Sequence, residues 1–181
     1  MTSVVIGKSN TGKSELAEKL ALETGDDKVY YLATMNVCDD AGRERVVKHR
    51  KQREGKGFIT IEKQKDIAGI LDETGDAAGS TVLLECVANL VSNYIFVDGF
   101  DISKIDADTE CERIASVASD EIRALAGKVH NLIIVTNEYD KDGEGYDDET
   151  RFYVRTLSRT NELIIPFCDK VHDLLADDKG N

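Results

Sequence analysis

Residues 3–24, SVVIGKSNTGKSELAEKLALET, combine three patterns that together predict a phosphate-binding loop. The apolar run 4–6 predicts a buried strand, and residues 7–14 follow it with the spacing G-x-x-x-x-G-K-S. The residues after Gly12 place apolar side chains at helical intervals, which predicts an amphipathic helix. Strand, loop and helix in this order are the context that a P-loop requires, and they disfavour a glycine-rich turn that matches by accident. The stretch therefore predicts binding of a nucleoside triphosphate.

The residue types in this loop suit the binding of phosphate and Mg²⁺. The two glycines let backbone N–H groups converge on phosphate oxygens, and the start of the helix adds the positive end of its dipole. We expect Lys13 to bridge the β- and γ-phosphates and the Ser14 hydroxyl to ligate Mg²⁺. The nucleotide-binding residues expected here are Gly7, Lys8, Ser9, Asn10, Thr11, Gly12, Lys13 and Ser14.

Length and composition restrict the class of protein. A chain of 181 residues suits one domain, so we expect residues 1–181 to form a single nucleotide-binding domain. No apolar run approaches the ~20 residues of a membrane span, and the N-terminus lacks the pattern of a secretory signal, so a cytoplasmic protein is expected. The net charge of −12 argues against nucleic acids and acidic membranes as partners. The four cysteines lie far apart without C-x-x-C spacing, which favours free thiols over a metal cluster.

Strand patterns alternate with helical patterns along the chain, which predicts an α/β fold. We expect a mainly parallel sheet flanked by helices, of the P-loop NTPase type with a RecA-like arrangement. Strands are expected at 29–34, 58–62, 81–85, 129–136 and within the terminal IIPFCDKVHDLL; helices at 39–54, 66–73, 86–97, 108–126 and 150–163; and loops at 98–107 and 140–149.

Two further residues are candidates for chemistry. Glu85 ends a buried strand, where a carboxylate in P-loop proteins reaches the Mg²⁺ ion beside the loop hydroxyl; the alternative is a carboxylate that only faces water. His49 lies between Lys48 and Arg50 in a basic segment. A neutral imidazole there could attack an α-phosphate, and the neighbouring cations could hold the charge of the nucleotide. Composition alone favours a solvated surface histidine.

Six short motifs, in order, are more specific than the loop by itself. The basic H-R-x-x-R segment, followed by L-L-E-C and V-T-N-E, is the most specific part. The set resembles the bifunctional adenosylcobinamide kinase / adenosylcobinamide-phosphate guanylyltransferase family of cobalamin biosynthesis, through most of residues 3–138. The motifs are GKSNTGKS (7–14), YLAT (31–34), RVVKHRKQR (45–53), ITIE (59–62), LLEC (83–86) and VTNE (135–138).

The resemblance implies two reactions with ATP and GTP as substrates. In the first, a nucleoside triphosphate with Mg²⁺ phosphorylates the aminopropanol hydroxyl of adenosylcobinamide. In the second, His49 attacks the α-phosphate of GTP and carries GMP to adenosylcobinamide phosphate, giving adenosylcobinamide-GDP. The resemblance also implies a homo-oligomer, namely a homotrimer. The residues it adds to the site are Arg45, Arg50 and Arg53 on the GTP phosphates, Glu62 near the nucleotide, and Ser14 with Glu85 on Mg²⁺.

The chain departs from the family pattern after Glu138, where residues 139–146 replace a glycine-rich turn. Asn137 and Glu138 themselves follow a predicted central strand, so either a site role or a loop-capping role fits them. Two alternative functions remain at this stage. One is a P-loop kinase of small molecules without the histidine chemistry, and the other is a regulator that binds nucleotide without turnover.

Overall fold

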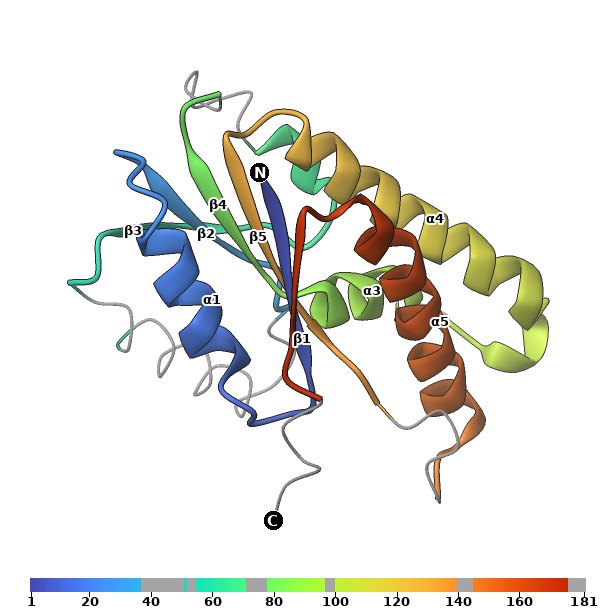
Figure 1. The fold of residues 1–181 in the computed structure, drawn as a ribbon. Coiled ribbons are helices and arrows are strands. Elements are labelled where there is room, and N and C mark those ends of the chain that lie inside the picture. The colour runs from blue at the N-terminus through green and yellow to red at the C-terminus, as the bar shows by residue number, and fades with distance from the viewer. Residues whose placement is uncertain (37–50, 52–54, 71–77, 97–99, 140–144, 176–181) are drawn as a thin grey trace, which may run out of the picture.

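The computed structural model is a six-stranded parallel sheet with helices on both faces, which confirms the predicted fold class (Figure 1). The strand order is β3-β2-β4-β5-β1-β6. The described residues are 1–181 except 37–50, 52–54, 71–77, 97–99, 140–144 and 176–181. The strands are β1 (Thr2–Gly7), β2 (Val29–Ala33), β3 (Phe58–Glu62), β4 (Thr81–Glu85), β5 (Asn131–Asn137) and β6 (Lys170–Asp173).

The three central strands β4, β5 and β1 are buried almost throughout, because helices cover both of their faces. Helix α1 packs on one face, and α3, α4 and α5 pack on the other (Figure 1). Ala17 and Ala21 are fully buried and let α1 approach the sheet closely. The helices are α1 (Lys13–Leu22), α3 (Val87–Ile95), α4 (Ala107–Ala126) and α5 (Asp148–Ile164), with short 3₁₀ turns η1 (Ile67–Gly69), η2 (Ile102–Lys104) and η3 (Ile165–Phe167).

Aspartate side chains fix the starts of the two long helices. Asp106 accepts hydrogen bonds from the backbone N–H groups of Asp108 and Thr109, which begins α4. Asp147 accepts one from Thr150 and begins α5. Helix α5 therefore starts two residues earlier than the helical pattern predicts, because a carboxylate cap satisfies the exposed N–H groups of its first turn.

Some expected elements are replaced or lie outside the described residues. The helix expected at 39–54 lies outside them except for Lys51, and the loop expected at 140–149 does so through residue 144. Of the helix expected at 66–73, the described part forms only the single turn η1. No helix in the described ranges is long and apolar enough to cross a bilayer.

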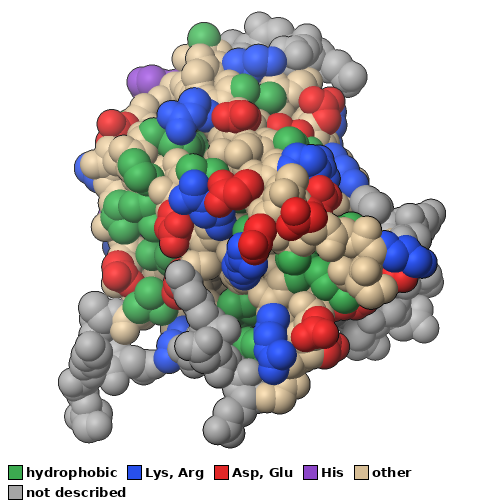
Figure 2. Space-filling model, turned by 90° about the vertical axis from the view of Figure 1, so that its right-hand side faces the viewer, with side chains coloured by type: hydrophobic (Ala, Val, Ile, Leu, Met, Phe, Trp, Pro, Cys, Tyr) green, Lys and Arg blue, Asp and Glu red, His purple; other side chains and the backbone are tan. Residues whose placement is uncertain are grey.

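The surface formed by α4 and α5 carries interleaved basic and acidic side chains (Figure 2). Arg155 pairs with Asp108, and Arg159 bridges Glu112 and Glu162 at 2.8 and 3.1 Å. The pairs Arg155–Asp108 and Arg159–Glu112 join the two helices across their exposed faces, whereas Arg159–Glu162 lies within α5. Exposed pairs of this kind each contribute only about 0–1 kcal/mol, so the buried sides of the helices hold the layer together.

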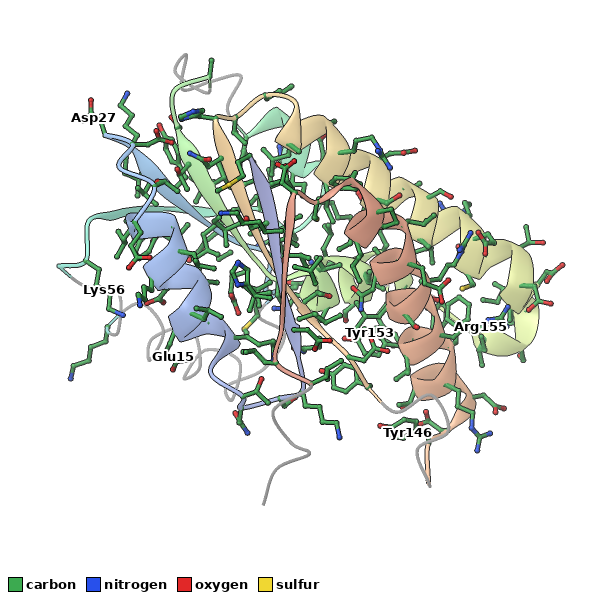
Figure 3. All side chains as sticks on the ribbon, in the orientation of Figure 1. Glu15, Asp27, Lys56, Tyr146, Tyr153 and Arg155 are labelled. Carbon is green, nitrogen blue, oxygen red and sulfur yellow. The ribbon has the colours of Figure 1, made fainter. Side chains whose placement is uncertain are left out.

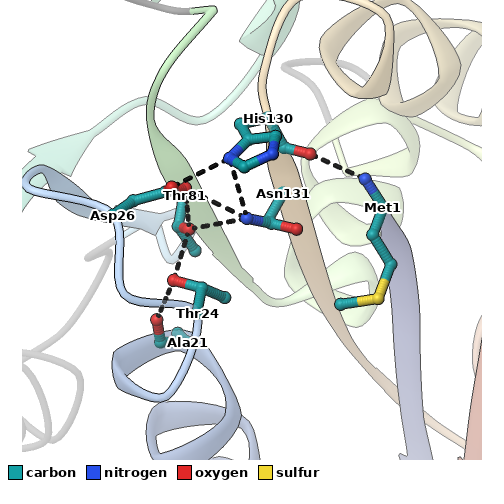
Figure 4. A network of polar contacts seen from close by, with 7 residues as sticks. All are labelled: Met1, Ala21, Thr24, Asp26, Thr81, His130 and Asn131. Carbon is teal, nitrogen blue, oxygen red and sulfur yellow. Dashed lines mark hydrogen bonds and ion pairs between the residues drawn. The ribbon is translucent and has the colours of Figure 1, made fainter.

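A polar network closes the amino-terminal edge of the sheet, opposite the predicted nucleotide site (Figure 4). One carboxylate oxygen of Asp26 accepts from the Thr81 hydroxyl at 2.7 Å and from the Asn131 amide at 3.0 Å, while the other lies 2.8 Å from Nδ1 of His130. Burial raises the pKa of Asp26, but the hydrogen bonds from Thr81, His130 and Asn131 outweigh it and lower the pKa below its ordinary value. The charged carboxylate therefore stabilises the fold at neutral pH.

We expect Asp26→Asn to lower the free energy of unfolding by about 1–3 kcal/mol at neutral pH, because an amide cannot accept all of these bonds. Since the folded-state pKa is lowered, the contribution of Asp26 is lost as the pH falls through that pKa. The difference in the free energy of unfolding between wild type and Asp26→Asn should therefore become smaller in acid. Urea unfolding from neutral pH down to about pH 3 measures it, with the exposed Asp27→Asn as the control. A gap that is equal at every pH would contradict this interpretation.

Candidate nucleotide-binding site

The phosphate loop follows β1 and has the backbone shape that its glycines permit. Gly12 has φ of 80° and Asn10 has φ of 61°, both in the left-handed region. A Cβ atom on Gly7 would lie 2.8 Å from Oγ1 of Thr11 and 3.1 Å from Cβ of Leu174. Only glycine fits at position 7, so this close approach explains the first glycine of the motif.

The loop ends at the start of α1, where backbone N–H groups are open to a ligand. The N-cap is Gly12, and no side chain in the described part of the chain makes a capping hydrogen bond there. The loop residues 8–10 and Gly12 are exposed. An uncapped helix start combines unsatisfied N–H groups with the positive end of the dipole, which suits it to phosphate.

Lys13 is the buried cation of the site. Its side chain is only 7% exposed, and its ammonium group donates to the backbone carbonyl of Lys8. Burial lowers the pKa of Lys13, and the nearby groups Cys86, Glu85 and Glu15 partly oppose this shift. A partly desolvated ammonium interacts more strongly with an anion than an exposed one does. Lys13 is therefore placed to hold phosphate oxygens.

Ser14 and Glu85 bring two oxygen atoms together from different elements. The Ser14 hydroxyl on α1 donates to Oε1 of Glu85 at the end of β4, at 3.0 Å. The two residues are 71 positions apart in the sequence. Hydroxyl and carboxylate oxygens are hard donors of the kind that Mg²⁺ accepts.

The chain that follows Glu85 is held by Thr34, which lies just after β2. The Thr34 hydroxyl accepts from the backbone N–H of Cys86 at 2.9 Å and donates to its carbonyl at 2.8 Å. The Asn93 amide donates to the carbonyls of Thr34 and Gln64 at 2.7 and 2.9 Å. The peptide bond between Glu85 and Cys86 is cis. Thr34 therefore holds the backbone just after Glu85, and Asn93 holds Thr34.

The described cysteines are free thiols, as the sequence predicts. Burial first, and the charge of Glu85 next, raise the pKa of Cys86 to about 12. Its sulfur stays protonated near neutral pH, which makes it a poor nucleophile and a poor metal ligand. No group of three or more His, Cys, Asp or Glu side chains in the described ranges could hold a metal ion.

The end of β5 lies beside the loop and is held by α5. The register pairs Asn137 with Gly7, and the backbone N–H of Glu138 donates to the Gly7 carbonyl at 3.1 Å. Asn161 accepts from the Thr136 hydroxyl at 2.7 Å and donates to the Asn137 carbonyl at 3.0 Å. Residues 137 and 138 are therefore part of the edge that faces the loop.

The remaining predicted residues divide into two groups. Glu62 lies at the same edge of the sheet as Glu85, because both pair in register with Ala33. Two strand spacings separate them, or about 10 Å, so Glu62 lies across β2 and away from the loop. His49 and the arginines expected near it, Arg45, Arg50 and Arg53, lie outside the described residues.

Sequence reasoning did not identify Thr34, Asn161 or Tyr139 as parts of this edge. Thr34 lies within a quoted motif, but its contact with Cys86 joins residues 52 positions apart. Asn161 lies in the last turns of α5 and is buried. An asparagine at an apolar position of an amphipathic helix is the sequence signal that could have identified it. Tyr139 hydrogen-bonds to Asn137 and is described below.

Comparison with known proteins identifies the family of this chain. A family model described as "Cobinamide kinase / cobinamide phosphate guanyltransferase" matches residues 3–176. The chain is 27% identical to the bifunctional adenosylcobalamin biosynthesis protein CobP of Pseudomonas aeruginosa over 171 residues, which cover 94% of this chain and 91% of that protein.

Two relatives named CobU give the same result. The bifunctional adenosylcobalamin biosynthesis protein CobU of Escherichia coli K12 is 29% identical over 155 residues, covering 83% of this chain and 81% of its own. CobU of Salmonella typhimurium LT2 is 29% identical over 180 residues, which cover 94% of this chain and 93% of that protein. With the loop geometry and a family match over nearly the whole chain, this protein belongs to the cobinamide kinase / cobinamide phosphate guanyltransferase family.

Proposed function

We propose that this chain phosphorylates adenosylcobinamide with ATP or GTP and then transfers GMP from GTP to the phosphorylated product, giving adenosylcobinamide-GDP. The observation that carries the proposal is the convergence of Lys13, Ser14 and Glu85 at an open helix start in a chain of this family. A protein that only binds nucleotide does not need a nucleophile such as His49.

In the kinase step, the aminopropanol hydroxyl attacks the γ-phosphorus, the bond to the β,γ-bridging oxygen breaks, and the nucleoside diphosphate leaves. Loop N–H groups and Lys13 hold the phosphates and offset the charge that develops on them. Such positioning and charge stabilisation are the main contributions that a protein makes to phosphoryl transfer.

The donor set at Ser14 and Glu85 fits Mg²⁺. This ion is usually bound through one or two protein oxygens, with water and substrate phosphates completing its shell. The 3.0 Å contact between the hydroxyl and Oε1 of Glu85 supplies such a pair. Bound there with a triphosphate, Mg²⁺ would neutralise charge on the phosphate oxygens.

In the guanylyl step, an imidazole nitrogen of His49 attacks the α-phosphorus of GTP and pyrophosphate leaves, so that GMP is held as a phosphoramidate. A phosphate oxygen of adenosylcobinamide phosphate then attacks the same phosphorus and releases the imidazole. Basic residues beside His49, including Arg45, Arg50 and Arg53, would hold the phosphates of GTP. Glu62 lies at the same edge of the sheet and is proposed to contact the nucleotide.

The proposal also includes the cellular location and the oligomeric state. Free thiols at Cys86, Cys111 and Cys168 suit a reducing compartment, which supports a cytoplasmic location. We propose a homotrimer as the working assembly.

The test is to incubate the protein with adenosylcobinamide, Mg²⁺ and either ATP or GTP, and to identify the corrinoid products by mass spectrometry. We expect adenosylcobinamide phosphate with either nucleotide and adenosylcobinamide-GDP with GTP. The phosphate product alone would support the kinase without histidine chemistry. Neither product, from folded protein that still binds nucleotide, would overturn the proposal.

A further inference from the structure

Four aromatic side chains form a continuous row that begins beside the phosphate loop. Tyr139 and Tyr153 have ring centroids 6.2 Å apart, Tyr153 and Phe96 are 6.3 Å apart, and Phe96 and Phe100 are 5.5 Å apart. We call these four residues the aromatic wall. Phe96 is 46% exposed, whereas Tyr139 and Tyr153 are half-buried. The wall therefore extends from the edge of the site to the protein surface.

The inner end of the wall is joined to the site by hydrogen bonds. The phenol oxygen of Tyr139 accepts from the Asn137 amide at 2.8 Å, and Asn137 pairs in register with Gly7. The Tyr153 hydroxyl donates to the carbonyl of Ala88 at 3.4 Å, in the first turn of α3 just after Glu85 and Cys86. Tyr139 therefore contacts the end of β5, and Tyr153 contacts the first turn of α3, which follows β4.

The wall and the loop lie on opposite faces of the sheet. Helix α1 covers one face, and α3 and α5, which carry Phe96 and Tyr153, cover the other (Figure 1). Figure 3 shows Tyr153 on the inner side of α5, whereas Arg155 points away from the sheet. In-line phosphoryl transfer needs the acceptor opposite the leaving group. With α1 and the loop on one side of the strand ends, we expect the acceptor to approach from the side of the wall.

We propose that the aromatic wall binds the corrin macrocycle of the phosphoryl acceptor and so places its hydroxyl near the end of β5. The inference rests on the proposed function, because it assigns that function's acceptor to a surface. Large, partly apolar ligands are bound by apolar and aromatic side chains, with a few polar groups that fix orientation. The aromatic wall has this combination of groups, because its rings end at the polar Asn137–Tyr139 pair. The neighbouring surface of α4 and α5 is charged instead (Figure 2).

The test compares binding of adenosylcobinamide to wild type, Tyr139→Leu and Phe96→Ala, measured by absorbance titration without nucleotide. Phe167→Ala is the matched control, because Phe167 lies beyond the far end of α5 and packs against Arg123. Circular dichroism and nucleotide affinity establish that each variant is folded. We expect the dissociation constant for the corrinoid to rise about tenfold in each wall variant, as the loss of an aromatic contact commonly causes. The affinity for nucleotide should not change in Phe96→Ala, and Phe167→Ala should bind both the corrinoid and the nucleotide as wild type does.

Unchanged corrinoid affinity in both wall variants would overturn the inference. It would also be overturned if Phe96→Ala altered the oligomeric state in size-exclusion chromatography while corrinoid affinity stayed constant, since the wall would then be a contact between copies. Failure of the proposed function looks different: wild type itself would bind nucleotide but no corrinoid.

Discussion

Replacing Lys13 with alanine is expected to reduce phosphorylation of adenosylcobinamide about 100- to 1,000-fold, the range found when one preorganised charge donor is removed from an active site. The reason lies in the environment of Lys13: the residue is buried at the start of α1, and its partly desolvated ammonium group lies near Glu85. No other lysine of the described loop is buried, because Lys8 is exposed. Water that enters the vacated space cannot supply a fixed positive charge.

The measurement is a single-turnover rate of product formation at saturating nucleotide, with Lys19→Ala as the control. Lys19 lies on the exposed side of the same helix and forms a surface pair with Glu23 at 3.8 Å. That variant should keep the wild-type rate. Full activity in Lys13→Ala would remove the loop lysine from the proposed mechanism.

Replacing His49 with alanine is expected to abolish guanylylation of the protein while leaving the kinase step within a few-fold of wild type, because only the second reaction needs a covalent carrier. Alanine has no nitrogen to attack the α-phosphorus. The kinase groups Lys13 and Ser14 lie on α1, and Glu85 lies at the end of β4. The two activities should therefore separate in one variant.

The mass of the intact protein after incubation with GTP and Mg²⁺ measures guanylylation directly. Wild type should gain the mass of GMP, and the adduct should be lost in acid, as a phosphoramidate is. Incubation with ATP serves as one control, and His130→Gln, a change at the opposite edge of the sheet, serves as another. An adduct that persists in His49→Ala would move the nucleophile to another residue.

The sequence predicted well those features that depend on neighbouring residues. The loop from Gly7 to Ser14 is contiguous, so its backbone shape follows from local spacing. Glu85 was predictable as a strand end, because a run of five residues with apolar centre marks a buried strand in an α/β chain. The carboxyl ends of parallel strands meet at one edge of the sheet, and there Glu85 accepts a hydrogen bond from Ser14 at the start of α1.

Features that depend on distant pairs were not predictable. Nothing near Thr34 in the sequence indicates that its hydroxyl holds Cys86. The helical pattern around Asn161 can indicate a buried polar residue, but not that its side chain holds the end of β5. The aromatic wall combines residues from α3, α5 and the chain after β5, which only tertiary packing brings together. Helix starts shifted by one or two residues where an aspartate cap, as at Asp147, decided the boundary.

The position of β1 in the sheet has a consequence for how the protein is made. Its two neighbours are β5 and β6, which lie in the last third of the chain. Both hydrogen-bonding edges of the first strand therefore stay unpaired until that part has been synthesised. During synthesis the ribosome releases the phosphate loop early, yet Gly7 gains its partner Asn137 only after 130 further residues have emerged. Contacts of such long range form slowly, and exposed strand edges are prone to aggregation meanwhile. The first motif to be translated is thus among the last parts to become functional.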